Sequence, residues 1–277
     1  MKTTELVEGV HSSVLGFGCA PILGAVDSVK SQRAIEFAID NGITHFDLAR
    51  SYGYGEAEKF VGKVIKNRRD KVVIASKFGI KPSWAASILK PAKPFLRFIK
   101  GKPAAKPLRP ADESSKLSDY FLKRIPLTGA EMRKSLERSL KELRTDYIDY
   151  FFIHEPRNFL VNVDELSEMA EVLKKEGKIR GWGLAYMRSK EHVHKPYLNK
   201  FGLLQFDNSP GASGYEAVVS ERGLKPNIIF SPLRGGSSEL SASEKLQKLF
   251  NDFPKSVVLC SMFNEKHLME NIKLLNK

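Results

Sequence analysis

Four side chains that could exchange protons lie at or just after the ends of predicted β-strands. Apolar runs of the sequence end in Asp47, Lys77 and His154, and Tyr52 follows the first of these runs closely. A carboxylate at the end of a buried strand is costly unless an opposite charge pairs with it, and Lys77 at the end of the next strand is the natural partner. With a phenol and an imidazole beside that ion pair, the sequence predicts a proton-transfer site.

The elements that would position these side chains alternate between strand and helix. Residues 43–46 read as the end of a buried strand, and residues 56–66 read as a helix with acidic residues in its first turn. Residues 72–77 and 147–154 read as two further strands. In a barrel of alternating strands and helices, the carboxyl ends of the strands face the active site, which would bring the four side chains together.

The whole chain repeats this alternation. The predicted strands are residues 14–18, 43–46, 72–77, 147–154, 179–184, 203–206, 228–230 and 257–260. Eight strand–helix alternations are what a closed (β/α)8 barrel, or TIM barrel, of the α/β class requires, and residues 5–18 read as an N-terminal capping hairpin followed by the first strand. The rival architecture, a doubly wound open sheet, predicts a glycine-rich phosphate loop after the first strand. Gly16-Phe-Gly18 lacks the third glycine of such a loop.

One long segment interrupts the alternation. A length of 277 residues suits one large α/β domain or two small ones. We expect a single barrel domain over residues 1–277, with residues 79–126 as an inserted loop or lid after the third strand. The insertion is rich in Lys and Pro, and its centre is residues 90–103. Long connections of this kind are functional lids or mobile segments. We favour a lid over a phosphate-bearing ligand, with a disordered flap as the alternative.

Composition and charge narrow the class of protein. The formal charge of +13 and the pI of about 9.6 favour anionic ligands such as the phosphates of a cofactor. Cys19 and Cys260 are too few for a disulfide framework. The start of the chain lacks a signal-type apolar region, and no apolar run is long enough to cross a bilayer. We therefore expect a cytoplasmic protein, and the sequence contains no spaced cluster of metal ligands.

The motifs, taken in order, resemble those of the aldo-keto reductase family. The matching segments are Asp47-Leu-Ala-Arg-Ser-Tyr52-Gly, Glu58 to Gly62, Ala75-Ser-Lys77, Asp146 to His154, Gly177-Lys-Ile-Arg180, Phe230-Ser-Pro-Leu233 and Glu270-Asn271. The resemblance runs from about Gly16 to Asn271. It implies a TIM-barrel enzyme that reduces the carbonyl group of an aldehyde or ketone with NADPH or NADH and requires no metal.

The resemblance implies a role for each of the four side chains. Tyr52 would donate a proton to the carbonyl oxygen as hydride arrives from the nicotinamide. The pKa of a free phenol is about 10, and the Lys77 ammonium would make the phenol a better acid. Asp47 would hold Lys77 charged and in place, and His154 would orient the carbonyl and stabilise the charge that develops on its oxygen. Tyr54 is the rival acid, which we expect to face the substrate instead.

The resemblance also implies contacts with the cofactor. Gln205 would contact the nicotinamide carboxamide, and Phe230 would stack on the nicotinamide ring. The candidates for the rest of the dinucleotide are Ser231 and Leu233 near the pyrophosphate, Glu270 and Asn271 at the adenine, and in addition Arg234, Ser261, Asn264 and His267.

Two departures from the family pattern bear on the cofactor. The usual Ser-Asn pair after the fifth strand is Ala185-Tyr186 here, and Tyr186 could replace the lost contacts by stacking. The usual basic residues after the eighth strand are Ser261-Met262 and His267 here. Those basic groups normally hold a 2′-phosphate, so their replacement keeps NAD as the alternative to NADP, the cofactor that we expect. Arg234, Lys266 or the basic segment 79–126 could supply the missing charge.

Other interpretations stay open at this stage. Taken singly, each of the four residues has a structural explanation, such as a helix cap for Asp47 or a core histidine for His154. The rival enzyme is an NAD-preferring sugar or polyol dehydrogenase, and the rival without catalysis is a reductase-like binding subunit that docks through residues 88–103. We expect a small-molecule carbonyl substrate and neither nucleic acid nor membrane as a partner, with the oligomeric state open. We assign no chemistry to His194, which we place on a helix surface.

Overall fold

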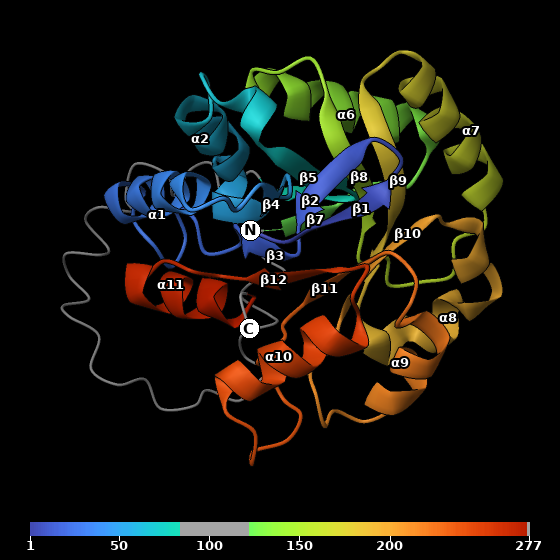
Figure 1. The fold of residues 1–277 in the computed structure, drawn as a ribbon. Coiled ribbons are helices and arrows are strands. Elements are labelled where there is room, and N and C mark those ends of the chain that lie inside the picture. The colour runs from blue at the N-terminus through green and yellow to red at the C-terminus, as the bar shows by residue number, and fades with distance from the viewer. Residues whose placement is uncertain (84–121, 276–277) are drawn as a thin grey trace.

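Eight parallel strands close into a barrel in the computed structural model, which describes residues 1–83 and 122–275 (Figure 1). The strands are β3 (Leu15–Gly18), β4 (His45–Asp47), β5 (Val73–Phe78), β8 (Ile148–His154), β9 (Ile179–Tyr186), β10 (Leu203–Asp207), β11 (Asn227–Phe230) and β12 (Val257–Cys260). They follow one another around the barrel in chain order, and β12 pairs with β3 to close it. The predicted (β/α)8 barrel is confirmed.

Both faces of the barrel strands are buried, which explains why they read as continuous apolar runs. On β8, Tyr150 and Phe152 belong to the cluster of side chains that fills the barrel. Phe151 and Ile153, from the same strand, belong to the larger cluster that packs beneath the helices. Successive side chains of a strand point to opposite faces, so one run of residues supplies both clusters.

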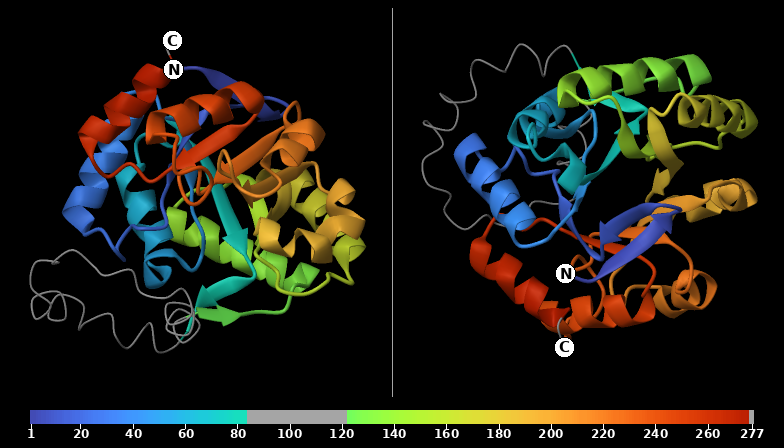
Figure 2. Two further views of the ribbon diagram at one scale, coloured as in Figure 1. Left: turned by 90° about the horizontal axis from the view of Figure 1, so that it is seen from below. Right: turned by 45° about the horizontal axis from the view of Figure 1, so that its top comes forward.

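The helices surround the barrel (Figure 2). They are α1 (Ser28–Asp40), α2 (Ala57–Val64), α6 (Gly129–Leu143), α7 (Val163–Lys175), α8 (Glu191–His194), α9 (Tyr215–Arg222), α10 (Ala242–Asp252) and α11 (Glu265–Leu274), with 3-10 turns η1 (Tyr52–Gly55), η2 (Arg69–Lys71), η3 (Arg188–Lys190) and η4 (Lys195–Lys200). α1 begins after Asp27, whose side chain accepts a hydrogen bond from the backbone N–H of Lys30. The backbone N–H of Glu131 donates in the same way to the Thr128 hydroxyl that precedes α6.

The N-terminal hairpin closes one end of the barrel. β1 (Thr3–Val7) and β2 (Val10–Ser13) pair antiparallel, and Leu6 and Val10 pack into the cluster that fills the barrel. The Ser12 hydroxyl lies 3.3 Å from the Tyr150 hydroxyl and 3.2 Å from Nδ1 of His45. His45 is the first residue of β4, so the hairpin covers the amino ends of the strands. The carboxyl ends, where the candidate residues lie, face the opposite way.

A two-stranded ribbon brackets the insertion after the third barrel strand. β6 (Ile80–Pro82) and β7 (Leu122–Arg124) pair antiparallel, so the chain leaves and re-enters the fold at one place. The predicted lid over residues 90–103 and the predicted docking segment over residues 88–103 lie outside the described residues. Within the described ranges, no helix is long and apolar enough to cross a membrane.

Two local expectations are corrected by the structure. The fifth barrel strand does not end at residue 184 but continues to Tyr186, because its pairing with β8 extends to Ala185 and its pairing with β10 extends to Tyr186. The placement of His194 on a helix surface is wrong, since its side chain is fully buried. Nδ1 of His194 lies 2.5 Å from the Tyr197 hydroxyl, so this histidine is a hydrogen-bonded part of the core.

Candidate active site

Asp47 and Lys77 form a buried ion pair at the carboxyl ends of adjacent strands. β4 and β5 pair in register, which brings Nζ of Lys77 within 2.7 Å of Oδ2 of Asp47. The same ammonium donates to the carbonyl of Leu48 at 2.7 Å. Burial is the largest single effect and lowers the pKa of Lys77, but Asp47 and Tyr52 together outweigh it and the pKa is raised overall. Lys77 is therefore a cation at neutral pH.

Tyr52 lies directly above this pair. It is the first residue of η1, just beyond β4, and its hydroxyl is 3.3 Å from Nζ of Lys77. The next two residues, Gly53 and Tyr54, adopt left-handed backbone angles with φ of 58° and 59°, which turns the chain back towards α2. A Cβ at Gly53 would meet the carbonyl oxygen of Ile22 at 2.8 Å, so this turn requires glycine. The turn therefore fixes where the phenol stands.

The acidity of Tyr52 differs from the expectation. Burial raises the pKa of Tyr52, Lys77 lowers it and Asp47 raises it, and the result is about 12. Lys77 acts in the direction expected, but the desolvation of the phenolate is the larger effect. Lys77 thus makes the phenol more acidic than burial alone would leave it, but not more acidic than a free phenol. The phenol is fully protonated at neutral pH and has a proton to donate.

His154 completes the group from the end of β8. Its ring centroid lies 6.1 Å from that of Tyr52, edge to face. Burial, Lys77 and Arg124 together hold the pKa of His154 well below its usual value, so the imidazole is neutral. Among the described residues, Nδ1 of His154 has no hydrogen-bond partner. A buried imidazole nitrogen of this kind is available to a ligand.

A single cavity of about 150 Å³ joins these four side chains at the mouth of the barrel. Each of the eight barrel strands contributes one lining residue, namely Gly18, Asp47, Lys77, His154, Ala185, Gln205, Phe230 and Leu259. Ala20, Tyr52, Glu155, Ser231 and Ser261 complete the wall. The cavity therefore lies where the carboxyl ends of parallel strands converge, as active sites of this architecture do.

Four of the ten cofactor-binding candidates line this cavity. They are Gln205, Phe230, Ser231 and Ser261. Nε2 of Gln205 donates to Oδ1 of Asp47 at 2.9 Å, while its buried Oε1 has no partner among the described residues. Gln205 can therefore accept a hydrogen bond from an amide group of a ligand.

The other six candidates are not brought into the cavity. They are Leu233, Arg234, Asn264, His267, Glu270 and Asn271. Asn264 caps α11 by accepting a hydrogen bond from the backbone N–H of Lys266 at 2.9 Å. Glu270 lies within α11 and 4.0 Å from Nζ of Lys266. The roles of all six residues stay predictions, and they concern the part of a dinucleotide that lies beyond the nicotinamide.

The expectation that Tyr186 stacks on a cofactor ring is wrong. Tyr186 belongs to the cluster beneath the helices, with its ring centroid 5.9 Å from that of His194 and 6.0 Å from that of Phe206. Ala185, one residue earlier, faces the cavity, and successive side chains on a strand face opposite ways.

The cavity wall also contains Tyr52 and not Tyr54, so the predicted contact of Tyr54 with substrate remains without a site in this structure.

Glu155 lines the cavity and was missed by the sequence reasoning. It follows His154 directly and has a left-handed backbone with φ of 44°. The available signal was a second ionisable residue at the end of the same apolar strand.

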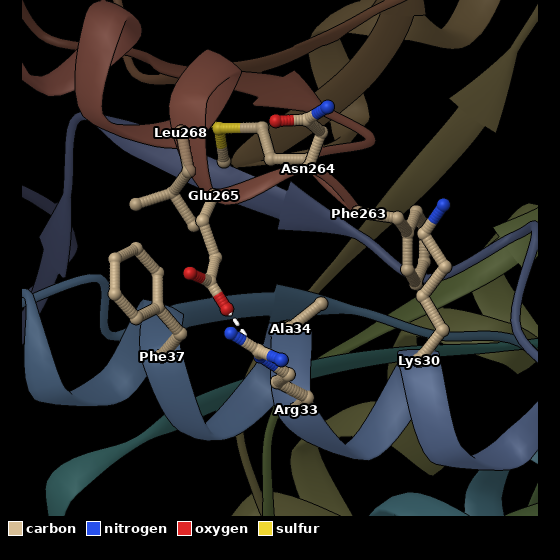
Figure 3. A pocket seen from close by; sticks show the side chains of 9 residues that line it. Lys30, Arg33, Ala34, Phe37, Phe263, Asn264, Glu265 and Leu268 are labelled. Atoms are coloured by element: carbon tan, nitrogen blue, oxygen red, sulfur yellow. Dashed lines mark hydrogen bonds and ion pairs between the residues drawn. The ribbon is translucent and has the colours of Figure 1, made fainter.

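A second hollow of about 330 Å³ lies between α1 and α11 (Figure 3). Its walls carry Lys30 and Arg33 from α1 and Phe263 from the segment before α11. Arg33 forms an ion pair with Glu265 across the two helices, as the dashed line in Figure 3 marks. None of the four clustered side chains lines it, so this hollow is separate from the barrel mouth.

Comparison with known sequences identifies relatives of this chain. The model described as "Aldo/keto reductase family" matches residues 14–196. The aldo-keto reductase YhdN of Bacillus subtilis (strain 168) is 31% identical over 192 residues, which are 67% of this chain and 47% of that protein. The methylglyoxal reductase YeaE of Escherichia coli (strain K12) is 28% identical over 214 residues, 73% of this chain and 59% of that protein. The match thus spans about half the length of these curated relatives.

Solved structures share the fold over nearly the whole chain. An aldo-keto reductase from Klebsiella pneumoniae in complex with NADPH has a TM-score of 0.68 at 21% identity, with 100% of this chain and 90% of that chain covered. An aldo-keto reductase from Bacillus halodurans in its holo form has a TM-score of 0.70 at 23% identity, with coverage of 100% and 91%.

Proposed function

The chain belongs to the aldo/keto reductase family, and from that premise we propose that it is an oxidoreductase that reduces an aldehyde or ketone to an alcohol with NADPH or NADH. One observation carries this proposal. The Tyr52 hydroxyl, the Lys77 ammonium, the Asp47 carboxylate and the His154 imidazole share one cavity at the mouth of the barrel. A non-catalytic binding subunit has no need of all four groups together.

Each of the four residues has one part in the reaction. A bound nicotinamide would supply a hydride to the carbonyl carbon, and the π electrons of the C=O bond would then move to oxygen. Tyr52, protonated because its pKa is about 12, gives its proton to that oxygen. Lys77 stabilises the phenolate that remains, and Asp47 holds Lys77 in place at 2.7 Å. Neutral His154 directs an N–H at the same oxygen and stabilises its developing charge.

The wall of the cavity fits a nicotinamide. The unpartnered Oε1 of Gln205 would accept a hydrogen bond from the carboxamide, and the Phe230 ring offers an apolar face. Ser231 and Ser261 would contact the part of the cofactor that leads from the nicotinamide out of the cavity. The six candidates outside the cavity, Leu233, Arg234, Asn264, His267, Glu270 and Asn271, would meet the pyrophosphate and the adenosine. We keep NADP as the proposed cofactor and NAD as the alternative.

A second candidate function is the oxidation of a sugar or polyol with NAD. A relative named D-threo-aldose 1-dehydrogenase, from Pseudomonas sp, is 25% identical over 199 residues. The raised pKa of Tyr52 favours reduction over oxidation at neutral pH, because oxidation needs a phenolate that accepts a proton.

We further propose a cytoplasmic location, since Cys19 and Cys260 are both free and buried.

The proposal is tested by cofactor binding followed by turnover. We expect NADPH to quench the protein fluorescence with saturation, and a panel of small aldehydes and ketones to be reduced at its expense. Repeating the titration and the turnover assay with NADH gives the cofactor preference. Binding of neither dinucleotide would refute the proposal, and tighter binding of NAD with turnover only of sugars above neutral pH would favour the dehydrogenase.

A further inference from the structure

Glu155 is held in the cavity wall by an unusual backbone conformation. Its φ of 44° is in the left-handed region, which a non-glycine residue adopts only when its surroundings enforce it. The backbone N–H of Glu155 donates to the carbonyl of Ala185 at 2.7 Å, and Nη1 of Arg124 donates to the carbonyl of Glu155 at 2.6 Å. β9 and the ribbon strand β7 thus fix this residue beside His154.

The charges in the cavity do not balance. Asp47 and Lys77 neutralise each other as an ion pair, and His154 and Tyr52 are uncharged at neutral pH. No hydrogen bond or ion pair joins the Glu155 carboxylate to any of residues 1–83 and 122–275, although the residue lines the cavity. One negative charge in the wall is therefore left over.

Two cations oppose the effect of burial on the Glu155 carboxyl group. Burial is the largest effect and raises the pKa of Glu155, Lys77 and Arg124 lower it, Asp207 raises it, and the pKa is raised overall. Lys77 and Arg124 favour the ionised form, and alkaline pH favours it further. An ionised carboxylate without a partner accepts hydrogen bonds strongly and repels other anions.

We propose that Glu155 determines the substrate specificity of this reductase: it selects uncharged carbonyl compounds with a hydroxyl group next to the carbonyl and excludes those with a carboxylate there. The inference rests on the proposed function, because it assigns the substrate class of the same site. A carbonyl oxygen that meets Tyr52 and His154 places its neighbouring carbon in the same small cavity as Glu155. A hydroxyl on that carbon can donate to the carboxylate, whereas a carboxylate on that carbon meets a like charge.

Three two-carbon aldehydes test this inference, because they differ only in the group next to the carbonyl. They are acetaldehyde, glycolaldehyde and glyoxylate, each reduced with NADPH at about pH 8, well above the usual pKa of a carboxyl group. The variants are Glu155→Gln, which removes the charge at nearly constant shape, and Glu155→Leu, which also removes the hydrogen-bond acceptor. Glu171→Gln is the matched control, because Glu171 is an exposed residue of α7 paired with Lys174. Comparing each variant with the wild type cancels the hydration of each aldehyde.

We expect opposite changes for the two polar substrates. In Glu155→Gln, the ratio of kcat/KM for glyoxylate to kcat/KM for acetaldehyde rises at least about tenfold. In Glu155→Leu, the advantage of glycolaldehyde over acetaldehyde falls about tenfold, since a charged acceptor is lost. Glu171→Gln changes none of the three ratios, and the Kd for NADPH is the same in all variants.

The outcomes separate this inference from the proposed function. If the wild type reduces acetaldehyde and Glu155→Gln changes all three substrates by one common factor, Glu155 is structural and the specificity inference is overturned alone. If glyoxylate is the best substrate of the wild type, the inference is likewise overturned. If the wild type reduces no carbonyl compound with either cofactor, both the proposed function and the inference fail.

Discussion

The Tyr52 hydroxyl lies 3.3 Å from the Lys77 ammonium, yet the pKa of Tyr52 is raised to about 12. A cation at that distance stabilises the phenolate, but the buried site withholds the water that would solvate it. Lys77 therefore offsets part of the burial instead of producing an unusually acidic phenol. Burial and then the same ammonium lower the pKa of His154, so one cation acts on the protonation of both residues that would contact the carbonyl oxygen.

Removing the Tyr52 hydroxyl should abolish catalysis and spare binding. Tyr52→Phe keeps the ring that packs edge to face on His154 and removes the only proposed proton donor. We expect kcat to fall by roughly 10²- to 10⁴-fold, the usual contribution of a general acid, with the Kd for NADPH unchanged. Stopped-flow and fluorescence titration measure the two quantities. Tyr54→Phe is the matched control, and equal loss in both variants would contradict the assignment of Tyr52.

The raised pKa of Tyr52 predicts a specific titration. A raised pKa means that the phenol stays protonated through the range in which free tyrosine, with a pKa of about 10, ionises. The ultraviolet difference between wild type and Tyr52→Phe should therefore show no phenolate up to about pH 11. In Lys77→Met the ionisation should move to still higher pH, because the cation that lowers the pKa is gone. A midpoint at or below pH 10 in the wild type would contradict this account.

At the scale of elements, the sequence predicted the strand ends that carry the candidate residues, but it did not predict which face of a strand each side chain lies on. β4 and β8 end in Asp47 and His154, and β5 carries Lys77 one residue before its last. Parallel strands bring such ends together. A strand buried on both faces has no polar alternation, so nothing in the sequence assigns Ala185 to the cavity and Tyr186 to the helices. The position of Glu155 depends on a left-handed backbone conformation. In a sequence, that conformation is normally indicated only by a glycine.

The contact between α2 and α6 predicts that Gly62→Ala destabilises the protein, although helix propensity alone would favour alanine. Gly62 lies inside α2, where alanine would normally be more favourable by up to about 1 kcal/mol. A Cβ at Gly62, however, would lie 2.4 Å from the carbonyl oxygen of Leu143 at the end of α6. We expect Gly62→Ala to lower the free energy of unfolding by about 1–3 kcal/mol, as overpacking does. Urea denaturation measures the change.

Gly202 is the matched control for that substitution. A Cβ there meets no atom within 4 Å, and its φ is not in the left-handed region. Gly202→Ala should change the free energy of unfolding by less than about 0.5 kcal/mol, as surface substitutions usually do. A stabilising Gly62→Ala would mean that α2 and α6 are not packed as closely as the structure has them.

At the scale of the whole molecule, the barrel has one closed end and one open end. The hairpin covers the amino ends of the strands, where Ser12, His45 and Tyr150 meet. Burial and then Lys77 lower the pKa of His45 to about 3, so that end of the interior holds an uncharged imidazole. The candidate catalytic charges lie at the other end, and the formal charge of +13 gives the whole molecule a field that attracts anions.

This field predicts how salt should act on the two cofactors. NADPH carries one phosphate more than NADH, so the long-range attraction of a protein with a charge of +13 is stronger for NADPH. Raising KCl from about 0.05 to about 0.5 M shortens the screening length to a few ångströms. We therefore expect the Kd for NADPH to rise about threefold to tenfold more than the Kd for NADH. Tyr52→Phe should behave as the wild type, because it removes no charge. A ratio of the two Kd values that is independent of salt would mean that the cofactor responds only to contacts within the site.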